Sequence, residues 1–229
     1  PATPSLLDDV FEIEPVPLDV FIKDKNFLGQ SSGLSPIQFD VVRHFEQILF
    51  PETYVKMVEE FGIDWSPVRF VNELNICWGK GSGKDFVLQV CFARVANLLL
   101  SLKNPQGYFG HASNSQIHMM NVAYNAPQAQ GSFFKPLRNL LVSSPFFKDK
   151  FETEEPGPQA VSVRFEKQLE LISGHSDADG LEGKNLIAAV ADEISAFPTI
   201  DLNRSGKPPA RSADAIVDML RSSASTRFP

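Results

Sequence analysis

Cysteine is scarce in this sequence, which excludes one common way of stabilising a small fold. Only two cysteines occur among 229 residues, far from the paired frameworks of small secreted domains. Cys77 and Cys91 lie in apolar segments, where free cysteine behaves as a small hydrophobe. We therefore expect both to be reduced residues of the core.

Long apolar runs are also missing. The longest mostly apolar stretch, residues 86–102, is interrupted by Gln89, Arg94 and Asn97, so it falls short of the roughly 20 apolar residues of a membrane span. Residues 1–17 are rich in proline and acids and lack the basic start and apolar run of a signal peptide. We expect a protein without membrane contact that stays in a cytoplasm.

Positive charge is in the minority: 21 Lys and Arg stand against 28 Asp and Glu, a net charge of -7. This balance argues against a broad basic surface for tight non-specific DNA binding, although a local basic patch stays open. The 43% of hydrophobic and 21% of charged residues are ordinary for a folded globular protein. The length predicts one substantial domain with a small appendage.

The pattern of apolar residues predicts alternating strands and helices. Residues 1–33 mix Pro, Asp, Gly and Ser and predict an extended arm or loop, with the main domain at 34–229. Ser35 as N-cap and Pro36 at the first position begin a helix. Helices are expected at 35–50, 51–62, 83–102, 127–142 and 212–224, and strands at 69–78, 117–124, 161–165, 168–173 and 186–191. This order predicts an α/β fold with a mainly parallel central sheet flanked by helices.

A glycine-rich turn lies between an expected strand and an expected helix. Its residues are Gly79, Lys80, Gly81, Ser82, Gly83, Lys84 and Asp85. Such a turn points backbone N–H groups into one concavity, and the helix N-terminus adds partial positive charge, so the turn predicts phosphate binding. Lys84 stands where the lysine of a phosphate loop stands and reaches the β- and γ-phosphates. The alternative is a plain glycine turn followed by a helix.

Two positions depart from the usual phosphate-loop pattern. Trp78 occupies the first glycine position, and Asp85 occupies the position of the hydroxyl that binds Mg²⁺. A carboxylate is a hard oxygen ligand that holds Mg²⁺ directly or through water, at the cost of placing negative charge near a polyphosphate. We expect binding of ATP with Mg²⁺ at modest affinity.

A second element carries an acid pair. The uniformly apolar run 186–191 predicts a central parallel strand covered on both faces, and it ends in Asp192 and Glu193. Asp192 is expected to bind Mg²⁺ through a water, and Glu193 to orient and polarise the attacking water as a catalytic residue. An acidic strand end facing solvent is the alternative.

These segments together resemble the large subunits of phage terminases. The glycine loop, the turn 179–185 that leads into the last strand, and Asp192-Glu193 carry the resemblance, which covers about residues 34–228. The turn 179–185 is the most specific of the three. The resemblance implies a RecA-like P-loop ATPase motor that drives double-stranded DNA into a procapsid in the host cytoplasm, in a homo-oligomeric ring with a portal protein and a small terminase subunit. The isolated domain is expected to be a monomer.

Other matches to this family are weaker. Gln38, in the segment 34–38, resembles the glutamine that contacts adenine, and the alternative is an exposed helix glutamine. The strand and turn 122–128 resemble a segment near the DNA-facing edge of related translocases. Lys80 stands where the family usually has Arg or Lys, which makes it a candidate for stabilising charge in the transition state.

One feature of the family has no counterpart in the expected elements. A further strand with a coupling motif follows the acid pair in terminases, whereas residues 213–224 have helical spacing. We therefore expect this chain to end before the coupling strand and to lack the nuclease domain. A helicase-type ATPase and a non-catalytic nucleotide-binding module remain alternatives.

Overall fold

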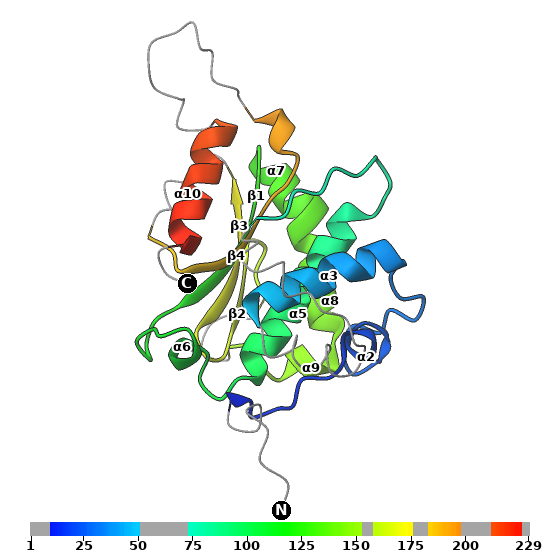
Figure 1. The fold of residues 1–229 in the computed structure, drawn as a ribbon, viewed down its shortest axis with the longest axis vertical. Helices are drawn as coiled ribbons and strands as arrows, with labels where there is room; N and C mark the ends of the chain where they lie inside the picture. Colours follow the sequence, from blue (N-terminus) through cyan, green and yellow to red (C-terminus); the bar gives the residue numbers. More distant parts are fainter. Residues whose placement is uncertain (1–9, 51–72, 153–157, 176–182, 198–211, 226–229) are drawn as a thin grey trace, which may run out of the picture. The chain divides into compact units, whose positions relative to one another are not determined.

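The computed structural model describes residues 10–50, 73–152, 158–175, 183–197 and 212–225 (Figure 1). The chain divides into two compact units, residues 1–103 and 104–229. Each unit has its own set of internal contacts.

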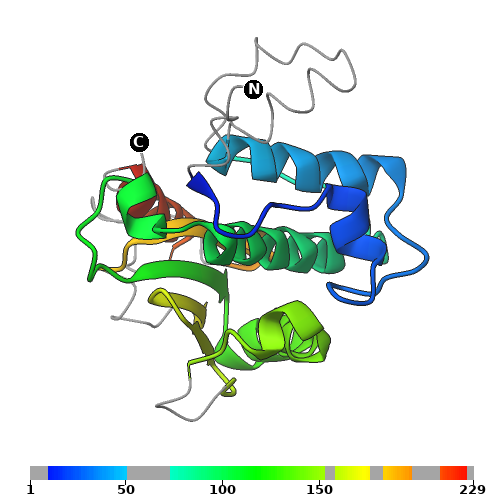
Figure 2. The same cartoon turned by 90° about the horizontal axis from the view of Figure 1, so that it is seen from below.

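Three helices form the described core of the first unit. They are α2 (Leu18–Lys23), α3 (Pro36–Leu49) and α5 (Lys84–Ser101). Figure 2 shows α3 running alongside α5. The helices predicted at 35–50 and 83–102 are therefore confirmed.

The start of α3 follows directly from its sequence. The Ser35 hydroxyl accepts from the backbone N–H of Gln38, and the Gln38 side chain accepts from the N–H of Ser35, which forms a capping box. Val42 and Glu46 lie on the buried side of α3, whereas Ile37 is 68% exposed.

Part of the segment expected as an unpacked arm is packed. Phe21 and Ile22 of α2 are fully buried, and Phe11 forms a β-bridge with Leu102. The expectation of an extended arm is wrong for residues 10–33, because three apolar side chains spaced along one short helix find cover within this unit. Residues 1–9 lie outside the described part of the chain.

The segment before the glycine loop also differs from its prediction. Residues 73–78 have no strand pairing, and Leu74 and Cys77 are exposed. The prediction of a strand over 69–78 is wrong for these residues, as is the prediction of a buried Cys77. Residues 69–72 and the helix expected at 51–62 lie outside the described residues. Cys91 is buried as expected, and burial raises the pKa of its thiol.

A buried arginine joins the elements of the first unit. Arg94 of α5 is 2% exposed, and its Nε and Nη2 donate to the two carboxylate oxygens of Glu46 on α3 at 2.9 and 3.0 Å. The guanidinium also donates to the Val16 carbonyl at 2.8 Å and lies 5.2 Å from the ring centre of Phe21. One side chain therefore fixes α5 to α3 and to the N-terminal segment.

The second unit contains a four-stranded sheet in the order β2-β3-β1-β4. Its strands are β1 (Ile117–Ala123), β2 (Ser162–Phe165), β3 (Leu169–His175) and β4 (Leu186–Ala191). β1 pairs in parallel with both β3 and β4, and β2 pairs antiparallel with β3. The predicted mainly parallel α/β sheet is confirmed. Among the described strands β4 lies at the end of the sheet, not at its centre, because an apolar run reports cover on both faces and not the number of neighbouring strands.

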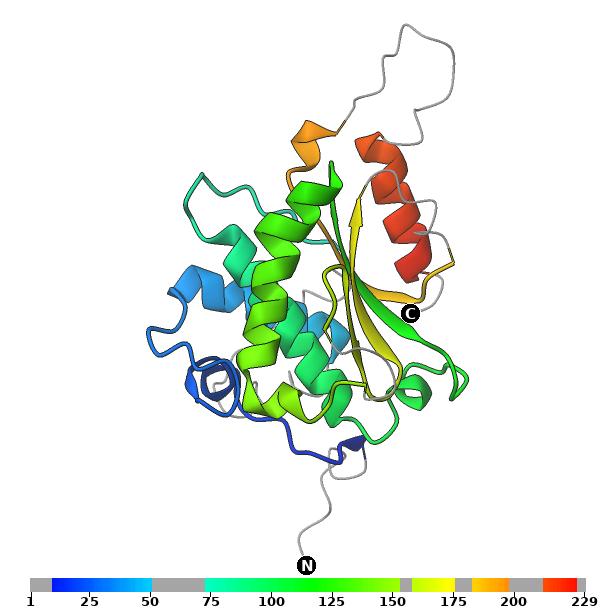
Figure 3. The ribbon, with the colours of Figure 1, turned by 180° about the vertical axis from the view of Figure 1, so that it is seen from behind.

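Helices cover both faces of this sheet (Figure 3). Residues 126–143 form one continuous helical segment made of α7 (Ala126–Gln128), the π-helix η2 (Ala129–Phe134) and α8 (Lys135–Ser143). η2 packs against β1 and β3, and the Asn121 side chain donates to the Ala129 carbonyl at 3.1 Å. On the other face, Met120 and Val122 pack with Ile216 of α10 (Ala213–Ser225).

Short helices complete the second unit. They are α6 (Pro105–Tyr108), α9 (Pro145–Lys148) and the 3-10 helix η3 (Ile194–Ala196). α9 lies between the helix expected at 127–142 and the strand expected at 161–165, and its Phe147 is fully buried. Residues 213–224, for which the spacing predicted a helix, lie on α10.

None of the described helices combines the length and apolar character that crossing a membrane requires.

Replacing Arg94 tests its structural role. Arg94→Ala leaves the Glu46 carboxylate buried without its partner, so we expect a loss of about 3–5 kcal/mol in the free energy of unfolding. Urea denaturation followed by circular dichroism measures it. The matched control is Arg221→Ala, which removes an exposed ion pair with Asp218 and is expected to cost about 0–1 kcal/mol. Equal losses for the two variants would contradict the role of Arg94.

Candidate nucleotide-binding site

The glycine loop of the first unit has a backbone that only glycine adopts readily. Gly81 and Gly83 have φ of +80° and +78°, in the left-handed region that costs other residues about 1–2 kcal/mol. The N–H of Ser82 donates to the Gly79 carbonyl at 3.2 Å, which closes a tight turn. Gly83 is the N-cap of α5. The first-turn N–H groups of α5 have no partner within the helix, so the loop ends on a ready-made anion site.

Two polar atoms in this loop are buried without a hydrogen-bond partner. They are the Ser82 hydroxyl oxygen and one carboxylate oxygen of Asp85. Buried polar atoms are nearly always paired, so an unpaired atom points to a ligand that completes its bonding. A hydroxyl suits a phosphate oxygen, and a carboxylate oxygen suits Mg²⁺ or a water bound to it. The residues present therefore fit a nucleotide with its magnesium ion.

The two lysines of the loop differ in position. Lys84 is the first residue of α5 and is half-buried, whereas Lys80 lies in the turn and is exposed. Both belong to the same short loop as the unpaired atoms of Ser82 and Asp85. The sequence-predicted phosphate-binding residues are thus brought together by one turn and the helix that follows it.

Gln38 connects α3 to the glycine loop. Its Nε2 donates to the Ser82 carbonyl at 3.0 Å, while its Oε1 accepts from the Ser35 N–H at 3.0 Å. A Cβ built on Gly83 would approach this Nε2 to 3.0 Å. Both ends of the amide are therefore engaged with the protein, which leaves one N–H and one oxygen lone pair of the amide for another partner.

In the second unit, the acid pair follows the carboxyl end of β4. The backbone N–H of Asp192 donates to the Val122 carbonyl of β1 at 2.9 Å, and Asp192 is 6% exposed. Glu193 is exposed and has a left-handed backbone, with φ of +49° and ψ of +47°. This conformation is uncommon for a residue other than glycine, asparagine or aspartate and clusters at functional sites. Both acids therefore follow β4 directly, but Asp192 is buried and Glu193 is exposed.

A glutamine from the neighbouring strand end contacts the acid pair. The Nε2 of Gln128 donates to Oε2 of Glu193 at 2.7 Å. The sequence places Gln128 in the strand and turn 122–128 but predicts no role for it. The signal present in the sequence was Asn125 followed by Pro127, which predicts a capped helix start directly after β1 and hence near the end of any parallel neighbour.

The turn before β4 is tied to the start of β1. The Asn185 side chain donates to the Gln116 carbonyl at 2.8 Å, and the Asn185 carbonyl accepts from the His118 N–H at 2.8 Å. Gly183 has φ of +83°. The described part of this turn, residues 183–185, is therefore bonded to the start of β1. Residues 179–182 lie outside the described part.

The predicted site residues thus form two groups. Gln38 and the loop residues 79–85 lie together in the first unit, and Asp192 and Glu193 lie together in the second. Within the residues that the structure describes, no three His, Cys, Asp or Glu side chains are grouped to hold a metal ion.

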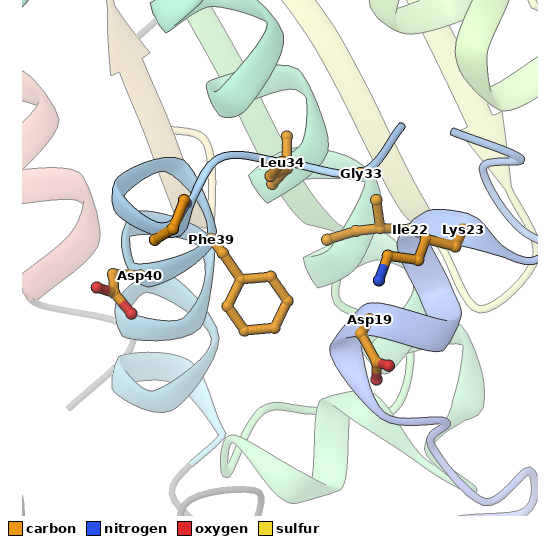
Figure 4. Close-up of a pocket in the computed structure, with 8 residues that line it drawn as sticks. Asp19, Ile22, Lys23, Gly33, Leu34, Phe39 and Asp40 are labelled. Atoms are coloured by element: carbon orange, nitrogen blue, oxygen red, sulfur yellow. The ribbon is translucent and has the colours of Figure 1, made fainter. Parts of the chain in front are cut away.

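A cavity of about 240 Å³ lies between α2 and α3 (Figure 4). Phe39 and Ile22 line it together with the charged side chains of Asp19 and Lys23. None of the predicted nucleotide-binding residues is among those that line this cavity.

The loop, the acid pair and the parallel sheet define a P-loop protein. Residues 4–229 match the family described as "Uncharacterized protein MJ0330, N-terminal P-loop domain", and the chain belongs to this family. It is 28% identical over 156 residues to "Uncharacterized protein MJ0330" of Methanocaldococcus jannaschii, an alignment that covers 66% of this chain and 25% of the relative. The chain thus spans about a quarter of the length of that relative. No solved structure gives a significant match.

A methyl group at Gly83 tests the loop geometry. Gly83→Ala combines a positive φ with a 3.0 Å approach to Gln38, so we expect the loop to shift and the affinity for ATP to fall about tenfold or more, since each 1.4 kcal/mol is a factor of ten. Isothermal titration calorimetry with ATP and Mg²⁺ measures this. The control Gly131→Ala places a methyl group in open space on η2. Unchanged ATP affinity in Gly83→Ala would show that the loop does not hold the phosphates.

Proposed function

We propose that this protein binds ATP with Mg²⁺ and hydrolyses it. The observation that carries the proposal is the pair of unpaired buried oxygens on Ser82 and Asp85, in a positive-φ glycine loop at the N-terminus of a long helix. An acid pair at the end of a parallel strand supplies one carboxylate for the metal ion and one to activate water. Membership of a P-loop family supports nucleotide binding.

Binding uses mainly the backbone of the loop. Gly81 and Gly83 turn their N–H groups toward the triphosphate, and the partial positive charge of the α5 N-terminus favours the anion. Lys84 pairs with the β- and γ-phosphate oxygens, and Ser82 donates its hydroxyl proton to a phosphate oxygen. Gln38 holds the loop against α3 through the Ser82 carbonyl.

Hydrolysis requires positioning and charge stabilisation more than covalent chemistry. Asp85 and Asp192 are the residues that would hold Mg²⁺, directly or through water, and the ion would supply positive charge to the phosphates. Glu193 orients and polarises the water that attacks the γ-phosphorus, and the bond to the β–γ bridging oxygen breaks to release ADP. Lys80 and Lys84 counter the charge that spreads over the γ-phosphoryl oxygens.

We further propose that hydrolysis drives translocation of double-stranded DNA, as in a terminase motor. The resemblance at 79–85, 179–185 and 192–193 supports this proposal. Within the middle segment, Asn185 also has a structural role, because its side chain bonds to the start of β1. The partners would be DNA, a portal protein and a small terminase subunit. A helicase-type motor is the main rival, because it uses the same nucleotide chemistry.

A non-catalytic nucleotide-binding module is the second candidate. Trp78 and Asp85 stand at loop positions where hydrolysing enzymes usually have glycine and a hydroxyl residue. Turnover of ATP with and without Mg²⁺ separates the two, since only an enzyme gains phosphate release on adding the metal.

Two substitutions separate binding from catalysis. We expect Lys84→Ala to abolish turnover and weaken ATP binding, because the γ-phosphate loses its ammonium partner. Glu193→Ala is expected to lower kcat by about 10²–10⁴ while ATP binding persists, because it removes only the group that activates water. Phosphate release and calorimetry measure the two effects. Lys135→Ala, an exposed lysine on α8, is the control. Parent-like turnover in both site variants would refute the assignment.

The motor proposal has its own assay. Double-stranded DNA is expected to raise ATP turnover, with a further rise on adding a small terminase subunit or portal protein. Strand separation by the lone protein would favour the helicase reading and contradict packaging.

A further inference from the structure

The contact between Gln128 and Glu193 joins residues 65 positions apart in the sequence. Its length of 2.7 Å lies at the short end of the range for an amide donor. Gln128 is half-buried and Glu193 is exposed. The two side chains come from different strand ends and meet through this bond.

Gln128 is held firmly at its backbone. Its N–H donates to the Asn125 side chain at 3.0 Å, and its carbonyl accepts from the Ser132 hydroxyl at 2.7 Å. Pro127 in the same turn has a fixed φ. The turn itself follows β1, which is buried along its whole length. The donor is thus presented from a rigid strand-to-helix junction.

Glu193 is held at its backbone but not along its side chain. The preceding residue, Asp192, is bonded to β1 through Val122, and the left-handed conformation of Glu193 sets the direction in which its side chain leaves the chain. The rest of the side chain has three rotatable bonds in solvent. Among the described residues, Gln128 supplies the only hydrogen bond recorded for its carboxylate.

We propose that Gln128 is a positioning residue that fixes the carboxylate of Glu193 for activation of the attacking water. The proposal rests on the hydrolytic function proposed above. A base must lie within hydrogen-bonding reach of the proton it accepts, and a small misplacement lowers the rate strongly. The amide binds one carboxylate oxygen, Oε2, and leaves Oε1 to receive the water. Gln128 does not touch the nucleotide.

Removing the donor is expected to change kcat and not KM. A hydrogen bond to a charged group is strong enough that Gln128→Ala should lower kcat for ATP at least about tenfold, while KM for ATP stays near that of the parent. Gln128→Glu keeps the shape of the side chain but replaces the donor with a carboxylate oxygen, so it should lose as much or more. Gln130→Ala, two residues further along η2 and with no side-chain hydrogen bond recorded, should behave as the parent.

A double substitution tests whether Gln128 acts through Glu193. On the Glu193→Ala background, the further change Gln128→Ala should not lower the residual turnover, because the group it positions is gone. Independent, multiplied losses would overturn the proposal. So would parent-like kcat in Gln128→Ala, or a rise in kcat, which would mean that the bond restrains Glu193.

The outcomes also separate this inference from the function on which it rests. Turnover that depends on Glu193 but not on Gln128 overturns the positioning role alone. Absence of any Mg²⁺-dependent turnover in the parent overturns the hydrolytic function itself, and the positioning role with it.

Discussion

The parallel pairing of β1 with β4 is the constraint that brings Asp192, Glu193 and Gln128 to one edge of the sheet. Parallel strands end at the same edge of a sheet, so the residues that follow them are neighbours whatever their distance in sequence. The bond from Asp192 to Val122 extends this pairing past the last residue of β4. It places a buried acid, an exposed acid and the Gln128 amide at a single edge, where α/β proteins commonly bind their ligands.

The glycine loop of the first unit depends on the helices that hold it in place. A loop with two positive-φ glycines is costly to order, and the helix that follows it must be held in place to present its N-terminus. Arg94 supplies this support in α5 by forming a bidentate ion pair with Glu46 on α3, and Gln38 of α3 returns to the loop. The same two helices therefore carry both the structural anchor and the phosphate loop of the first unit.

Local signals in the sequence predicted much of this arrangement. Ser35 and Pro36 begin the helix that they predicted, and the apolar run 186–191 is the strand that ends in the acid pair. The non-local features were not predictable in the same way. In the sequence, Arg94 is visible only as a charged residue that interrupts an apolar stretch. Its partner Glu46 is 48 residues away, so neighbouring residues do not predict the ion pair. The strand expected at 69–78 is not formed at 73–78, because apolar content alone does not provide a pairing partner. The bond from Gln128 to Glu193 follows only once the strand order is known.

We propose that the glycine loop and the acid pair act on one triphosphate. A crystal structure of the protein with Mg²⁺ and a non-hydrolysable ATP analogue tests this. We expect the Lys84 ammonium to lie within hydrogen-bonding distance of a γ-phosphate oxygen, Asp192 to face the metal or one of its waters, and Glu193 to face a water next to the γ-phosphorus. A nucleotide bound away from the loop, or a γ-phosphate with neither acid beside it, would refute the shared site.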